Sequence, residues 1–324
     1  MKSKKIFALL VLMIGTAACD ESFIERPSQT GPSTENYYNT AAQVRSATST
    51  LYGLPWSDFE NRAMDVIGDV MSGNMYTSNI DDRPFVNFTM SAASVRLQSA
   101  WSSFYKIGGW TSTLMQVLEQ KKAQGGNPEF IDPAIAECHF LKGTVYFYIG
   151  RIWGDAPIVN DPASIALSGN FNIPRYFKED VLRFALEELK LAEAGLPEDD
   201  EPGRVTKYSA KGMMAKLYLY IKDYDNARIK ALEVINSGKY SLVGMANPDL
   251  YASMFNSSSF NNNAESLFSI QHQLTQDPWG SGNQKNPDRG PGNLQTDEAS
   301  MWEMYIPSMD MKAMYEDGDI RRPA

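Results

Sequence analysis

With 324 residues, a net charge of -9, 43% hydrophobic and 21% charged residues, the chain has the composition of an ordinary globular protein. This length suffices to bury a sizeable core in one large domain or two average ones. The acidic balance argues against a nucleic-acid partner, because phosphates require a footprint of Lys and Arg.

The N-terminus has the pattern of a bacterial lipoprotein signal. Three lysines precede an apolar stretch, Ile6 to Ile14, that is too short to span a bilayer. Small residues then lead to Cys19, which we expect to be lipidated; an ordinary secretory signal with a chance cysteine is the alternative. Two or more acyl chains anchor a protein stably, whereas one does not. The sequence therefore predicts a signal peptide over residues 1–18 and contact with the membrane only through the lipid.

A short tether is expected before the folded body. Residues 19–33 are polar and contain Pro and Gly, which is typical of a linker. The predicted domain therefore covers residues 34–324. Its first helix is predicted to start after an N-cap at Ser33 or Thr34 and to end at Leu51, because apolar residues recur there at spacings of three and four.

The next predicted elements are a loop and two helices. Residues 72–98 lose the helical period and predict a loop, and the period returns from Trp101 to Leu118. The following helix is predicted to have Asp132 as its N-cap.

That second helix runs to Ile152 and is apolar around nearly its whole circumference, which is typical of a helix buried among other helices. Gly143 and Gly150 within it each cost up to about 1 kcal/mol relative to Ala. This cost is understandable if neighbouring backbones pack closely at both glycines. Cys138 on the same helix has no disulfide partner if the other cysteine carries lipid, and is expected to be a small buried side chain.

Three amphipathic helices are predicted next, at 178–195, 208–221 and 225–236. So few residues separate the last two that they must lie antiparallel. Asp223-Tyr-x-x-Ala is typical of a tetratricopeptide-type hairpin, in which the Ala lets the helices approach and the Tyr fills the corner. The acidic EDDE run before this hairpin predicts a solvated loop. The expected fold is mainly α: a scaffold of tetratricopeptide-like helical hairpins, with long irregular loops and a few short strands.

The composition changes after the hairpin. Residues 246–300 are rich in Asn, Ser, Gly and Gln, with isolated Phe and Trp. An irregular stretch of this length is usually functional or disordered. Alternation over residues 265–273 predicts a short strand, and helix is predicted to resume near 309–316.

Four segments resemble the SusD/RagB family of outer-membrane nutrient-binding lipoproteins. They are AECHFLKGTVYFYIGRIWGDAPIV, GRVTKYSAKGMMAKLYLYIKDYDNARIKALEVINSGKYSL, ESLFSIQ and YEDGDIRR. The lipoprotein signal and a W-x-x-x-Y-x-x-I segment agree in place and order. Family members commonly run some hundreds of residues longer, so a C-terminal part of the fold is expected to be missing from this sequence.

The resemblance implies a binding module that is not an enzyme. Its helical scaffold would dock on a SusC-type TonB-dependent transporter, and its loops would capture an oligosaccharide, or a peptide as in some relatives. It also implies an outer-membrane location, exposed at the cell surface. A scaffold that binds only its protein partner is a further alternative.

The irregular regions have the composition of a glycan site. Sugars present apolar C–H faces and many hydroxyls, so aromatic rings beside amides, carboxylates and Arg suit both surfaces. The candidate ligand residues are Asn74, Tyr76, Arg83, Asp277, Trp279, Asn283 and Arg289. No helical stripe explains Trp279, which either meets ligand or fixes its loop to the scaffold. Packing is favoured for Tyr76 and Trp56, and core positions are expected for Trp101, Trp110 and Trp153.

Catalysis, a cofactor and a metal centre are not expected. A glycosidase needs two carboxylates at a defined separation, but the acidic pairs at 81–82, 199–200 and 317–319 lie in hydrophilic runs, for which solvent exposure is the commoner explanation. The two histidines, His139 and His272, have no metal-ligand spacing. Phosphate-binding glycine loops and G-x-S-x-G are absent from the sequence.

Overall fold

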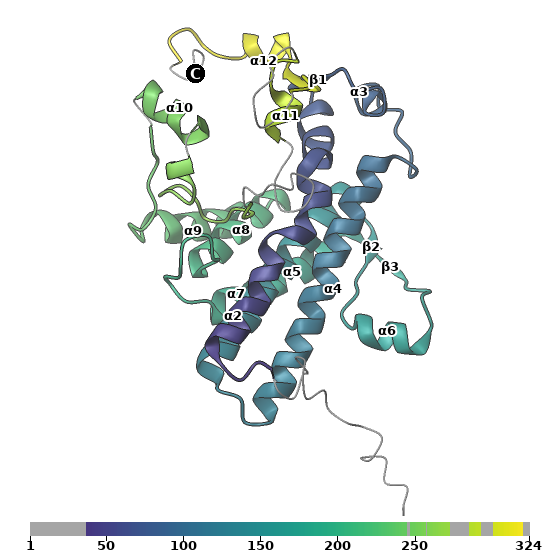
Figure 1. Cartoon of the computed structure of the whole chain (residues 1–324), viewed down its shortest axis with the longest axis vertical. Coiled ribbons are helices and arrows are strands. Elements are labelled where there is room, and N and C mark those ends of the chain that lie inside the picture. The colour runs from purple at the N-terminus through teal and green to yellow at the C-terminus, as the bar shows by residue number, and fades with distance from the viewer. Residues whose placement is uncertain (1–36, 245–246, 257, 273–284, 293–300, 320–324) are drawn as a thin grey trace, which may run out of the picture.

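The computed structural model describes residues 37–244, 247–256, 258–272, 285–292 and 301–319 (Figure 1). These residues are mainly α-helical and contain two short two-stranded sheets, which confirms the predicted fold class. The signal peptide, Cys19 and the tether lie outside the described residues. Among the residues that are described, none of the helices is both long and apolar enough to cross a bilayer.

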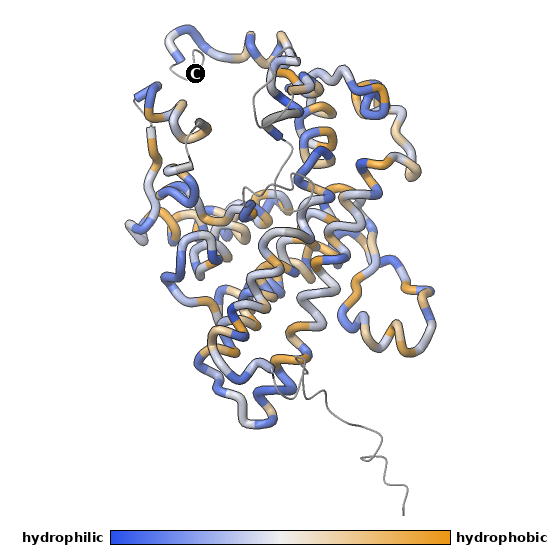
Figure 2. The backbone as a smooth tube through the Cα atoms, in the orientation of Figure 1, coloured by the Kyte–Doolittle hydropathy of each residue, from blue (hydrophilic) through white to orange (hydrophobic). Residues whose placement is uncertain are grey.

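A bundle of helices forms the scaffold. Its members are α2 (Ala41–Ser49), α4 (Val95–Ala123), α5 (Pro128–Ile152), α7 (Lys178–Gly195), α8 (Lys207–Tyr220) and α9 (Tyr224–Ile235). Helix α5 lies at the centre, packed against α2, α4 and α7, and the α8–α9 hairpin follows on α7. Figure 2 shows hydrophobic and hydrophilic residues alternating along these helices, as expected for surfaces that are buried on one side.

Shorter elements connect and extend the bundle. Before α4 they are η2 (Thr50–Tyr52), η3 (Leu54–Trp56), the π-helical η4 (Phe59–Ala63) and η5 (Val66–Val70), β1 (Met75–Thr77) and α3 (Arg83–Val86). After α5 they are β2 (Ala156–Pro157), α6 (Pro162–Ser168), β3 (Arg175–Tyr176), α10 (Pro248–Asn256), η6 (Ser258–Phe260), α11 (Lys285–Arg289), β4 (Tyr305–Pro307) and α12 (Met309–Ala313). Strand β2 pairs antiparallel with β3.

Two predicted helix starts are wrong, because stronger caps lie nearby. Helix α2 begins after Thr40, whose hydroxyl accepts from the backbone N–H of Gln43 while the Gln43 side chain accepts from that of Thr40. Helix α5 begins after Asn127, whose side chain accepts from the N–H of Glu129 at 3.0 Å. Asp132 therefore lies inside the helix.

Helix α5 is buried as predicted, and its glycines are contact points with α7. A Cβ on Gly143 would lie 2.8 Å from Leu189 Cγ, and one on Gly150 would lie 2.9 Å from Leu182 Cδ2. Real Cβ atoms do not approach neighbours so closely, so both glycines are required for the helices to meet. Cys138 is a free, buried thiol, and burial raises its pKa.

The α8–α9 hairpin is confirmed, with one correction. Ala227 is buried where the two helices meet, and the Asp223 side chain caps α9 by accepting from the N–H of Asn226. Tyr224, however, is 61% exposed and does not fill the corner.

The segment 265–272 is not the predicted strand. It runs without a strand partner among the described residues, and the Gln271 N–H donates to the Tyr52 carbonyl at 3.1 Å. Phe268 packs edge-on against Trp56 and Phe140. The alternation of the sequence therefore reflects a loop that is fixed to the core on one side. The predicted C-terminal helix is present as α12.

Three of the four tryptophans expected to pack do so. Trp56 is 2% exposed, and Trp101 packs edge-on against Trp153. Trp110 is 43% exposed, so its predicted core position is wrong. It borders a groove that residues of α2 and α4 line together.

Candidate functional site

The predicted irregular regions meet in a small lobe at one end of the bundle, made of residues 66–97, 285–292 and 301–307 (Figure 1). We call it the upper lobe. Strand β1 pairs antiparallel with β4, so that Tyr76 lies opposite Ile306. Helix α3 packs against η5, and α11 lies close to β4.

A buried carboxylate organises this lobe. Asp82, which the sequence placed in a solvated run, is fully buried and accepts from Arg96 Nε at 2.7 Å and from the Tyr305 hydroxyl. Burial and the Asp82 charge raise the pKa of Tyr305, which therefore stays a hydrogen-bond donor. Val66, Val70 and Phe85 complete the apolar core around this pair.

We expect Asp82→Asn to loosen the upper lobe while leaving the bundle folded. The substitution keeps the side-chain shape but removes the charge that holds Arg96, and a buried cation left without its partner is strongly destabilising. Hydrogen exchange should accelerate at residues 75–77 and 305–307. Exchange within α5 and α7 should be unchanged, and equal acceleration there would contradict a local role.

Two further ion pairs fasten α11 to the π-helical segment. Arg62 Nε lies 3.0 Å from Asp288 Oδ2, and Arg289 Nη2 lies 2.5 Å from Asp65 Oδ1. Both carboxylates are buried, and this burial raises their pKa values although the two arginines oppose the shift. Arg289, a predicted ligand residue, therefore holds the lobe together through one part of its side chain.

Three aromatic side chains of the described upper lobe are exposed. Phe88, which follows α3, is 67% exposed, and Tyr76 on β1 is 51% exposed. Trp302, which precedes β4, is 40% exposed, with Arg62 stacked 5.5 Å from its ring. Sequence reasoning missed Trp302. The signal was the same as for Trp279: a tryptophan outside any helical stripe.

The structure brings together the described members of the predicted site. Asn74, Tyr76, Arg83 and Arg289 all belong to the upper lobe; Arg83 is exposed, and the Asn74 carbonyl accepts from Ser308 N. Asp277, Trp279 and Asn283 lie outside the described residues.

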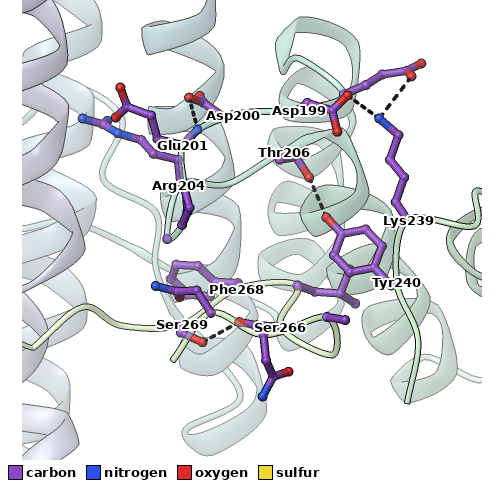
Figure 3. Close-up of a pocket in the computed structure, with 17 residues that line it drawn as sticks. Asp199, Asp200, Glu201, Arg204, Thr206, Lys239, Tyr240, Ser266, Phe268 and Ser269 are labelled. Atoms are coloured by element: carbon purple, nitrogen blue, oxygen red, sulfur yellow. Dashed lines mark hydrogen bonds and ion pairs between the residues drawn. The ribbon is translucent and has the colours of Figure 1, made fainter. Parts of the chain in front are cut away.

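A separate polar pocket of about 260 Å³ lies between the acidic loop 198–201 and residues 262–269 (Figure 3). Its acidic side chains are engaged: Asp200 pairs with Arg45 at 2.6 Å, and Asp199 pairs with Lys239. Burial would raise the pKa of Asp200, but hydrogen bonds from Arg45 and a backbone N–H lower it overall. The prediction that this run is simply solvated is therefore wrong for Asp200. Clusters of three or more His, Cys, Asp or Glu arranged for a metal do not occur among the described residues.

Comparison with known proteins identifies the class. A family model for SusD-like proteins, described as starch-binding and associating with the outer membrane, matches residues 25–219. The chain belongs to the SusD-like family.

Individual relatives agree with this assignment. A SusD-like protein of Bacteroides ovatus is 28% identical over 99% of this chain and 59% of its own length. A solved structure of a complex with a xylogluco-oligosaccharide is 29% identical, with a TM-score of 0.75 over 86% of this chain and 56% of that one. A surface glycan-binding protein A from Bacteroides fluxus shares the fold, with a TM-score of 0.72, 20% identity, and coverage of 88% of this chain and 63% of its own. The chain thus spans less than two thirds of the length of these relatives.

Proposed function

We propose that this chain is a surface lipoprotein that binds oligosaccharide on its upper lobe and delivers it to a SusC-type TonB-dependent transporter. The observation that carries the proposal is the exposure of Tyr76 and Trp302 on a lobe held rigid by buried ion pairs. The family match and the relative with a bound xylogluco-oligosaccharide support a glycan as the ligand.

The rings of Tyr76 and Trp302 can stack on the apolar faces of sugar units. Such rings are normally buried, so exposed ones on ordered backbone are available for stacking. Arg62 behind Trp302 and the exposed Arg83 supply donors for hydroxyl groups. Asp82 holds the β1–β4 pair in place through Tyr305 and Arg96. Binding of a ligand therefore needs little further ordering of the Tyr76 and Trp302 rings.

The remaining parts of the proposal rest on the sequence. Trp279, with Asp277 and Asn283, would extend the aromatic surface. Cys19 would carry the lipid that holds the protein at the outer membrane, and the helical bundle would dock on the transporter.

We expect Trp302→Ala and Tyr76→Ala each to weaken oligosaccharide binding about fivefold, since one stacked ring contributes on the order of 1 kcal/mol. Calorimetry with a xylogluco-oligosaccharide and affinity electrophoresis on a panel of polysaccharides measure this loss, with Trp279→Ala alongside. Trp110→Ala is the matched control, because that ring is similarly exposed but lies on the bundle.

Other outcomes would change the proposed site or the proposed class of ligand. Full binding by Trp302→Ala, Tyr76→Ala and Trp279→Ala would show that the site lies elsewhere. If the protein binds none of the glycans but co-purifies with a transporter, it is a scaffold, and binding of peptides alone would favour a peptide carrier.

A further inference from the structure

A methionine-lined groove separates the upper lobe from the bundle. Its volume is about 520 Å³. Met71 and Met90 line it from the lobe, Met64 lines it from the segment just before the lobe, and Trp153 and Tyr220 line it from the bundle. The polar side-chain groups of its lining are two tyrosine hydroxyls, the Trp153 indole N–H and the Arg151 guanidinium.

Three cations lie against tyrosine rings of this groove. Arg151, which itself lines the groove, and Lys178 have Cζ and Nζ atoms 5.8 and 5.3 Å from the centre of the Tyr220 ring. Lys216 Nζ lies 5.7 Å from the centre of the Tyr148 ring, which also lines the groove. We call these three side chains the cationic edge of the groove.

Among the described residues, no carboxylate forms an ion pair with Arg151, Lys178 or Lys216. The acidic side chain of Asp155 accepts from the backbone N–H of Lys178 at 2.9 Å and contacts Arg175. Burial and the charge of Arg151 together lower the pKa of Lys216. The cationic edge therefore has charge available for carboxylates of another molecule.

We propose that the groove is a docking site for an acidic amphipathic segment of a partner protein, with apolar side chains among the methionines and carboxylates on the cationic edge. Methionine side chains adapt to varied apolar shapes, which is typical of peptide-binding grooves. A sugar would leave most of its hydroxyls without partners against these walls. Charge complementarity selects an acidic segment over a basic one.

Gly68 offers a way to close the groove without disturbing the fold. It lies in η5 and lines the groove, and a Cβ there would meet no atom within 4 Å. Gly68→Leu therefore places a side chain into open space. Gly109→Leu is the matched control, because Gly109 is also helical and also has open space before it but lies in α4.

The test uses the mature chain and a fluorescent peptide of about 14 residues, four turns of helix, with Leu at helical spacing and Glu between. We expect saturable binding by fluorescence anisotropy, weakened by added KCl. Gly68→Leu and the pair Arg151→Gln with Lys216→Gln should each weaken binding about tenfold or more. Gly109→Leu, and Lys122→Gln with Lys190→Gln, should bind as the unmodified protein does.

Three results would overturn the proposal. The first is no saturable binding of the acidic peptide, and the second is equal binding of its Lys-for-Glu counterpart. The third is binding of an oligogalacturonide that depends on Arg151 and Lys216 but not on Gly68, because the cations would then recognise an acidic saccharide outside the groove.

Discussion

Arg204→Met should lower the free energy of unfolding by about 3–5 kcal/mol, as expected when a buried ion pair loses one partner. Arg204 Nη1 lies 2.7 Å from Glu137 Oε2, and the Glu137 side chain is only 2% exposed. The same guanidinium donates to the Arg45 carbonyl and to Thr48 Oγ1. Removing it leaves a charged carboxylate inside the bundle and removes one of the links between α2 and the loop before α8, where the Arg45–Asp200 pair remains. Urea denaturation followed by circular dichroism measures the change.

Two effects contribute to this loss: the buried charge of Glu137 and the lost packing of the Arg204 side chain. In the variant, the Glu137 carboxylate keeps the Tyr52 hydroxyl as a partner, at 2.7 Å. One hydroxyl does not replace a guanidinium, so we expect the buried charge to cause most of the loss.

A double substitution separates these causes further. Glu137→Gln with Arg204→Met removes both charges, so it should be more stable than Arg204→Met alone. Lys122→Gln is the surface control, because its partner Asp132 is about half exposed and such pairs contribute little. If the double variant is no more stable than the single one, the buried charge is not the source of the loss.

Gly143→Ala should lower the free energy of unfolding by about 2 kcal/mol, the middle of the range for overpacking a core. The added Cβ would lie 2.9 Å from the Ala185 carbonyl oxygen as well as close to Leu189, so α5 and α7 must separate. The gain of up to about 1 kcal/mol in helix propensity does not offset this separation. The measurement is again urea denaturation.

Gly109→Ala in α4 provides the control for Gly143→Ala. A Cβ there meets nothing within 4 Å, so only the propensity gain remains and the variant should be slightly more stable. Stabilisation of the protein by Gly143→Ala would mean that α7 can shift at little cost, and would remove close packing as the reason for the glycine.

The helical scaffold could be predicted because the sequence patterns that indicate its helices are local. Helices 178–195, 208–221 and 225–236 follow from apolar residues repeating at helical spacing, and the short connection sets the hairpin. Helix starts were less certain, because Asn127-Pro128 and Asp132-Pro133 offer the same capping chemistry five residues apart. The position of Trp110 was predicted wrongly because a helical stripe does not show where a groove between neighbouring helices leaves a ring exposed.

The candidate site was only partly predictable, because it is assembled from distant segments. The composition of the irregular regions indicated Tyr76 and Arg83, but not that Asp82 between them is buried. That burial depends on Tyr305, 223 residues away. Strands of three residues carry almost no periodicity, so neither β1 nor β4 could be found from its own sequence, and Trp302 was missed with them.

The pairing of β1 with β4 also has a consequence for biogenesis. The connection between Arg62 and Asp288, which are 226 residues apart, can close only after all the residues between them have been synthesised. The bundle can form earlier, from helices that are neighbours in the sequence. Folding of the scaffold can therefore precede assembly of the surface that we propose for sugar binding.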